Sequence, residues 1–291
     1  EFLGVIDALA HPERHGGDVA DAFDVVVPCL PGYGWSGPPV QADGRVGPIP
    51  PRRIAALWHR LMTEVLNFQT PYVAQGGDWG ASVSSWLAFD HASTAGGPGC
   101  GALHLNMVSL MPAAEDMTSL GADEQAWIAA ARTRQRDTMG YLQVQSTRPQ
   151  SLGPGLDESP IALAAWIVEK FQAWSDCGDD PLRSFTMDRL IDNLMVYWVT
   201  RSAGTSTWLY RAGANSAARR LPAGRRVEVP TAFSGYPADI ASPPPRAWLD
   251  RLCRLQHYRV MPRGGHFAAF EVPALWLEDV RAFVRQSLPR P

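Results

Sequence analysis

One short stretch limits the possible folds of this chain more than any other: a strand-like run that turns directly into a helical one. Residues 72–75 form a short apolar run, and residues 81–91 have the periodicity of a helix. Between them, Gly76-Gly77-Asp78-Trp79-Gly80 leaves room only for a tight turn. A strand that feeds a helix so directly is typical of α/β folds, in which parallel strands form a sheet covered by helices.

The same alternation of strands and helices occurs at both ends of the chain. The strands that we expect are residues 24–30, 72–75, 102–111, 227–233 and 258–261. The helices that we expect between and after them are residues 50–66, 81–91, 247–255 and 274–288. This order predicts an α/β fold with a mostly parallel sheet and helices on both faces.

The middle of the chain has a different pattern. It is rich in Trp and Tyr, offers no convincing buried strand, and has helical spacing over residues 124–141, 161–174 and 187–210. We therefore expect three parts: a first core segment, an inserted helical cap and a second core segment. Their boundaries are residues 1–112, 113–224 and 225–291.

Composition excludes several classes of protein. Apolar residues make up 46% of the chain and charged residues 19%, which excludes disorder. A net charge of -3 argues against nucleic acid as a partner. No apolar run reaches the ~20 residues of a membrane span. The 4 cysteines are widely separated, which argues against a zinc knuckle or a disulfide scaffold, so we expect a cytoplasmic protein with reduced thiols and no metal or cofactor.

Asp78 is a candidate nucleophile. Its Gly-x-Asp-x-Gly setting, between a strand and a helix, matches the elbow of α/β-hydrolases, with Asp where esterases carry Ser. Flanking glycines remove Cβ bulk from the turn, and the N–H groups of the following helix face developing negative charge. An ordinary helix N-cap is the alternative for Asp78.

Ser36 is a competing candidate nucleophile. It lies in Gly34-Trp35-Ser36-Gly37, but no helix begins there, so we expect its hydroxyl to bond turn backbone.

A charge pair for such a nucleophile is expected downstream. His266 follows the last predicted strand in a glycine loop, where open α/β sheets keep their sites. The order nucleophile, acid, His requires a carboxylate between them, and Asp239 lies in the loop after the penultimate strand. Glu228, inside that strand, and Asp250, on the next helix, fit this position less well. An ordinary loop aspartate remains the alternative for Asp239.

Several separated segments resemble the microsomal-type epoxide hydrolases of the α/β-hydrolase fold. The resemblance covers nearly the whole chain, including the predicted cap. The segments that carry it are residues 31–37 (PGYGWSG), 76–80 (GGDWG), 140–149 (GYLQVQSTRP), 192–198 (DNLMVYW), 208–210 (WLY) and 263–270 (RGGHFAAF).

This resemblance implies a role for each matching residue. Asp78 is the nucleophile, Asp239 and His266 are the charge pair, and Tyr141 and Tyr210 donate hydrogen bonds to the epoxide oxygen. The backbone N–H of Trp79 is one oxyanion donor. Many members carry Glu as the acid, where this sequence has Asp239 with its shorter side chain. From the residues alone, each tyrosine is better explained as a core aromatic with a satisfied hydroxyl, and Tyr197 competes equally with either of them.

The implied reaction converts an epoxide and water to a vicinal diol through an ester of Asp78. The Trp-rich cap suits a bulky apolar or aryl epoxide, and the resemblance leaves open a homodimer. Haloalkane dehalogenase is the nearest rival, since it also uses an elbow Asp followed by Trp. A catalytically silent ligand-binding relative of the fold is the rival from another class.

The start of the sequence shapes one further expectation. Residues 1–9 have helical spacing with no initiator Met, so we expect the chain to begin inside a helix of a longer protein. By the resemblance, an upstream segment would hold N-terminal strands and a loop with the second oxyanion donor. One of those strands would lie between residues 24–30 and 72–75 in the sheet.

Overall fold

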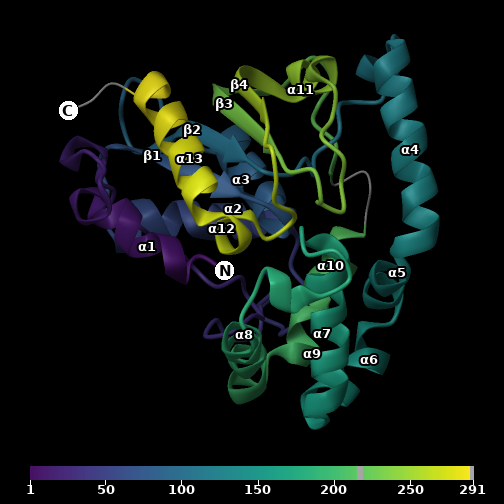
Figure 1. Ribbon diagram of the computed structural model, residues 1–291. Helices are drawn as coiled ribbons and strands as arrows, with labels where there is room; N and C mark the ends of the chain where they lie inside the picture. Colours follow the sequence, from purple (N-terminus) through teal and green to yellow (C-terminus); the bar gives the residue numbers. More distant parts are fainter. Residues whose placement is uncertain (215–218, 289–291) are drawn as a thin grey trace.

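The computed structural model describes residues 1–214 and 219–288, and a parallel β-sheet lies at its centre (Figure 1). Its four strands follow one another across the sheet in chain order, and each pairs in parallel with its neighbour. The strands are β1 (Pro71–Gly76), β2 (Gly99–Leu105), β3 (Val227–Gly235) and β4 (Cys253–Val260). Parallel neighbours need crossover connections: α3 (Asp78–Asp90) and α11 (Arg246–Leu252) provide two of them on one face, and α13 (Pro273–Ser287) covers the other. A parallel sheet with helices on both faces confirms the predicted fold class.

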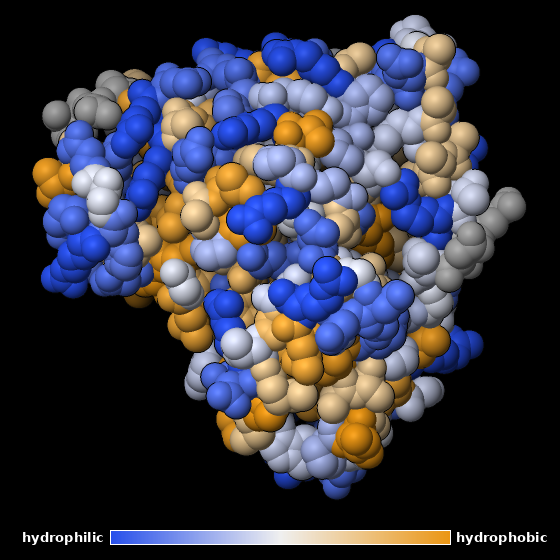
Figure 2. Space-filling view, in the orientation of Figure 1, coloured by the Kyte–Doolittle hydropathy of each residue, from blue (hydrophilic) through white to orange (hydrophobic). Residues whose placement is uncertain are grey.

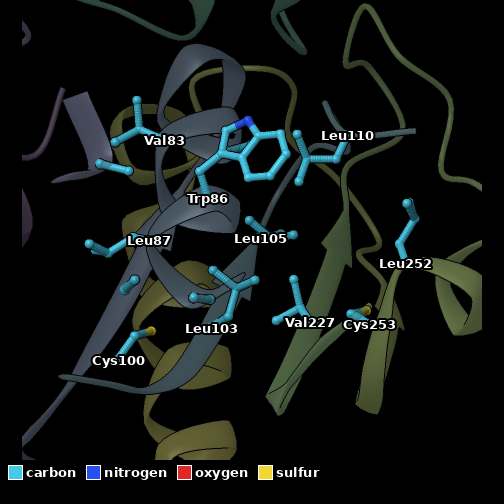
Figure 3. Close-up of a cluster of buried hydrophobic side chains, with 14 of the residues drawn as sticks. Val83, Trp86, Leu87, Cys100, Leu103, Leu105, Leu110, Val227, Leu252 and Cys253 are labelled. Atoms are coloured by element: carbon cyan, nitrogen blue, oxygen red, sulfur yellow. The ribbon is translucent and has the colours of Figure 1, made fainter. Parts of the chain in front are cut away.

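Successive residues of β2 point to opposite faces and fix which helices pack there. Leu103 lies in a cluster with Trp86 and Trp248, whereas Ala102 packs with Phe283. Figure 3 shows the first cluster between α3 and the strands. One face therefore carries α2 (Pro51–Arg60), α3 (Asp78–Asp90) and α11 (Arg246–Leu252). The other carries α13 (Pro273–Ser287), with α1 (Leu3–Ala10) and α12 (Ala268–Glu271) packed against it. Burial of one large apolar side chain stabilises the fold by ~1.5–3 kcal/mol.

A layer of helices lies beside the sheet, at the bottom and right of Figure 1. It comprises α4 (Ala122–Thr138), α5 (Gly140–Thr147), α6 (Pro149–Glu158), α7 (Pro160–Trp174), α8 (Met187–Thr200), α9 (Ala203–Ser206) and α10 (Trp208–Gly213). Apolar side chains reach the surface of this layer (Figure 2), among them Ile191 and Met195 of α8. In α4, Trp127 packs against Trp248 and so joins the layer to the core.

Two of the long helices expected in the middle are broken. The helix predicted over 124–141 divides at Met139, where the backbone leaves the helical region. The helix predicted over 187–210 divides after α8, because Arg201 has a left-handed φ of 52°. Short 3₁₀ helices cover Pro12–His15, Val19–Asp21, Glu115–Met117 and Pro181–Arg183, and a π-helical turn, Leu61–Val65, continues α2.

The strand predicted over residues 24–30 is wrong. The segment forms neither helix nor strand: β1 is the edge of the sheet, and no described strand pairs with residues 24–30. Val25 packs instead against the cluster formed by α1 and α13. A β-branched run becomes a strand only where a neighbour accepts its backbone hydrogen bonds. β2 also ends at Leu105, earlier than expected, and β4 begins at Cys253, where the sequence predicted helix.

A buried polar cluster ties α13 to three strands. The carboxylate of Asp279 lies 3.0 Å from His104 Nε2 and 2.8 Å from His257 Nε2, and it accepts a hydrogen bond from Ser234. Burial alone would raise the pKa of Asp279, but the hydrogen bonds from His104 and Ser234 outweigh it and lower that pKa. The sequence analysis missed this cluster, because its residues are far apart in the chain.

Asp279→Ala should lower the free energy of unfolding at pH 7 by about 3–5 kcal/mol, since it leaves buried polar groups without their partner. A carboxylate with a lowered pKa in the folded state stabilises above its unfolded pKa of ~3.9 and loses that contribution as pH falls further. The difference from wild type in urea unfolding should therefore shrink below about pH 4. Asp250→Ala, which removes an exposed partner of Arg246, is the control; equal losses in both variants would contradict the prediction.

Candidate active site

Asp78 stands where β1 turns directly into α3. Its φ of 42° lies in the left-handed region, which residues with a side chain rarely adopt. Gly76 makes this turn possible, because a Cβ there would lie 2.3 Å from the carbonyl of Gly80. Ser109, which sequence reasoning missed, donates a hydrogen bond of 3.1 Å from Oγ to the Asp78 carbonyl. The strained backbone is thus held by close packing and by a hydrogen bond.

The two glycines of the elbow motif are not equivalent. We predict from the sequence that both remove Cβ bulk, and the structure confirms this for Gly76. For Gly80 the prediction is wrong, since a Cβ there would meet no atom within 4 Å. Ser36 behaves as expected of a turn residue: its hydroxyl donates to the Cys29 carbonyl at 2.7 Å.

The three predicted charge residues meet at one edge of the sheet. His266 Nε2 lies 3.1 Å from Asp78 Oδ2, and His266 Nδ1 lies 2.7 Å from Asp239 Oδ1. The side chains of His266 and Asp239 are only 6% and 3% exposed, whereas that of Asp78 is 39% exposed. The short arm of Asp239 therefore reaches the imidazole, and only the carboxylate of Asp78 is open to a ligand.

The position of His266 between two carboxylates controls its charge. Burial disfavours the imidazolium and by itself lowers the pKa of His266. Hydrogen bonds and charge attraction from Asp239 and Asp78 outweigh burial and hold that pKa well above its usual range. The two carboxylates thus favour the imidazolium form of His266.

The two predicted phenols lie together beside Asp78. Tyr141, on α5, and Tyr210, on α10, have ring centroids 5.9 Å apart at 81°. Tyr210 also meets the Trp79 ring edge-on, with centroids 5.1 Å apart. Burial, and then the charge of Asp78, raise the pKa of both tyrosines, so both keep their protons at neutral pH.

A second pair of tyrosines lies near Asp78. The rings of Tyr33 and Tyr197 lie 6.5 Å apart, and the buried hydroxyl of Tyr33 has no hydrogen-bond partner among the described residues. Burial raises the pKa of Tyr197 to about 12, with smaller contributions from Glu1 and Asp78. Tyr197 thus stays near the site, as the alternative to Tyr210 requires. Tyr33 lies in residues 31–37, a segment that carries the family resemblance, but sequence reasoning gave Tyr33 itself no role.

The start of α3 offers donors for an oxyanion. Trp79 is the second residue of this helix, so its backbone N–H is in the first turn, where N–H groups have no acceptor within the helix.

Within the two described stretches, no cluster of three or more His, Cys, Asp or Glu side chains is placed to hold a metal ion. The same stretches contain no helix of the length and apolarity needed to cross a membrane.

Comparison with curated proteins finds relatives over nearly the whole chain. A Stigmatella aurantiaca protein, provisionally named an epoxide hydrolase, is 39% identical over 288 residues, covering 98% of this chain and 61% of its own length. Epoxide hydrolase 1 of Oryctolagus cuniculus is 33% identical over 306 residues, covering 98% and 65%. The chain thus spans less than two thirds of the length of these relatives. No protein-family model matches the chain.

Solved structures give the same result. The epoxide hydrolase of Aspergillus niger superposes with a TM-score of 0.77 at 30% identity, covering 99% of this chain and 69% of the other. The juvenile hormone epoxide hydrolase of the silkworm Bombyx mori superposes with a TM-score of 0.79 at 28% identity, covering 98% and 68%.

The inequivalence of the two glycines is testable. Gly76→Ala forces Cβ into the Gly80 carbonyl and should displace Asp78 or prevent folding. Gly80→Ala meets open space in the first turn of α3 and should leave the melting temperature equal or higher, since Ala is preferred to Gly in helices by roughly 0.5–1 kcal/mol. Circular dichroism melts of both variants check this. Equal destabilisation by the two substitutions would contradict the steric account.

Proposed function

We propose that this chain, which belongs to the epoxide hydrolase family of the α/β-hydrolase fold, carries the machinery that converts an epoxide and water to a vicinal diol through an ester of Asp78. The observation that carries the proposal is the line Asp78–His266–Asp239, with contacts of 3.1 and 2.7 Å, beside two protonated phenols. This arrangement supplies a nucleophile, a base and acids within one site.

The first half-reaction opens the epoxide. A carboxylate oxygen of Asp78 attacks a ring carbon, and the carbon–oxygen bond of the ring breaks with its electron pair on the oxygen. Tyr141 or Tyr210 gives that oxygen a proton and becomes a phenolate. An epoxide has a poor alkoxide leaving group, so donors placed where its charge develops lower the barrier.

The change in charge of Asp78 prepares the second half-reaction. As an ester Asp78 is neutral, so one of the two charges that held the proton on His266 is lost and the pKa of His266 falls. The proton passes to the phenolate and restores the phenol. The neutral imidazole, oriented by Asp239, can then act as a base.

Hydrolysis returns every group to its starting state. His266 takes a proton from water, and the water oxygen attacks the carboxyl carbon of Asp78. The backbone N–H of Trp79 stabilises the oxyanion that forms. The intermediate expels the diol oxygen, which takes the proton from His266, and the carboxyl of Asp78 gives its own proton back to His266.

The aromatic surroundings favour a bulky apolar or aryl epoxide. Rings of Trp79, Trp174 and Phe267 surround the reacting groups and their neighbours. We further propose that residues 113–224 form a cap inserted between core segments 1–112 and 225–291; residues 215–218 of this range lie outside the described residues. The homodimer and the cytoplasmic location stay predictions.

The rival functions fit the site less well. Haloalkane dehalogenase uses the same nucleophile and could bind a halide through the buried indole N–H of Trp79, but it has no use for the paired phenols Tyr141 and Tyr210. A silent ligand-binding relative is expected to have a broken charge line, whereas here Asp78, His266 and Asp239 are all within contact distance. Measuring diol formation against halide release separates the first rival, and any turnover excludes the second.

Asp78→Asn should abolish diol formation from a styrene-oxide-type substrate, because an amide cannot attack as a carboxylate does. Asp90→Asn is the matched control: it makes the same change at the other end of α3, where only the ion pair with Arg52 is lost. Chiral chromatography of the diol follows turnover, and intact mass confirms that the introduced amide has not hydrolysed back to a carboxylate. Unchanged turnover in the first variant would refute the mechanism.

Phenylalanine substitutions assign the acids. Tyr141→Phe and Tyr210→Phe should each lower kcat by ~10²-fold or more, the usual contribution of a positioned acid. Their folding should be unaffected in thermal melts, since the rings remain. A loss in Tyr197→Phe as large as that in Tyr210→Phe would transfer the role to Tyr197.

A further inference from the structure

A single ammonium group is held among aromatic rings next to the site. Lys170, on α7, has Nζ 4.8 Å from the ring centroid of Tyr141, 5.4 Å from that of Trp166 and 5.8 Å from that of Trp174. Its side chain is only 16% exposed. Lys170 is also the only lysine among the 26 basic residues of the chain, the others being arginines. A compact ammonium is thus kept at one position of an otherwise lysine-free chain.

The position of this charge matters because of the ring that it contacts most closely. A cation over the face of an aromatic ring is attracted by the negative π surface, more strongly where water is excluded. A phenolate ring carries a full negative charge, so the same cation favours the phenolate over the phenol. Trp174, which also borders Lys170, meets the ring of His266 edge-on, with centroids 5.2 Å apart. The ammonium thus contacts Tyr141 directly and is separated from His266 by the ring of Trp174.

We propose that Lys170 is a positioning residue for Tyr141, which it strengthens as a proton donor to the epoxide oxygen. The inference rests on the proposed function. As the Asp78 oxygen–carbon bond forms and the ring carbon–oxygen bond breaks, Tyr141 passes its hydroxyl proton to the ring oxygen. The electron pair of the O–H bond stays on Tyr141, and the fixed charge of Lys170 stabilises it until His266 returns a proton.

A neighbouring carboxylate opposes this charge. Glu169 pairs with Lys170, and its charge is one cause of the raised pKa of Tyr141, after burial and Asp78. The side chain of Glu169 is 56% exposed, so water screens its charge more than that of the largely buried ammonium. Glu169 and Lys170 therefore act on the Tyr141 ring with opposite signs, and the carboxylate is the more exposed of the two.

Lys170→Met tests the charge and keeps the apolar stem that packs on the rings. In stopped-flow tryptophan fluorescence, it should slow formation of the Asp78 ester about thirtyfold, the effect of one cation–π contact shielded from water, and leave ester hydrolysis unchanged. The loss should be smaller for epoxides with electron-withdrawing substituents, whose oxygen needs less help from an acid. Lys170→Arg, which keeps a positive charge over the ring, should restore most of the rate.

A double-mutant cycle separates this role from packing. In a Tyr141→Phe background, where there is no proton to donate, Lys170→Met should have no further effect on ester formation. Equal slowing of both half-reactions, a loss that does not depend on the epoxide substituent, or the same loss without the Tyr141 hydroxyl would overturn the proposal. If wild type forms no ester and no diol, the proposed function itself fails; if it forms both and Lys170→Met matches wild type, only the role of Lys170 fails.

Discussion

The close backbone contact between Gly76 and Gly80 is the constraint on which the site depends. It lets β1 enter α3 at once, and it fixes Asp78 in a left-handed conformation with its carboxylate facing outward. In a parallel sheet the carboxyl ends of the strands meet at one edge, so the loops after β3 and β4 bring Asp239 and His266 to the same place. One tight turn and one sheet topology thus assemble residues from distant parts of the chain.

Two clusters of His and Asp side chains differ in how far solvent reaches their carboxylates. Asp279 is fully buried and contacts His104, His257 and Ser234, so both of its carboxylate oxygens are already engaged. Asp78 is partly exposed and shares His266 with Asp239. The same types of side chain therefore hold α13 against the sheet in one place and leave one carboxylate open to solvent in the other.

Sequence reasoning succeeded where local pattern and chemistry agree. The elbow around Asp78 and the loop residues Asp239 and His266 were expected to meet from strand order, and their side chains are in contact; their roles stay a proposal. It failed where tertiary contacts decide. Residues 24–30 look like a strand but have no described neighbour to pair with. Gly80 occupies a small-residue position of the motif, but a Cβ there would meet no atom within 4 Å. Lys170 lies on α7 and Tyr141 on α5, so no local sequence pattern could show that the ammonium lies over the Tyr141 ring.

The central claim is that water attacks the Asp78 ester and not the epoxide. A single turnover in water labelled with ¹⁸O, with enzyme in excess over epoxide, tests it most directly by mass spectrometry of the peptide that contains Asp78 and of the diol. The account predicts one labelled oxygen in the Asp78 carboxylate and an unlabelled diol. Label in the diol with none in Asp78 would show direct attack by water and contradict the account.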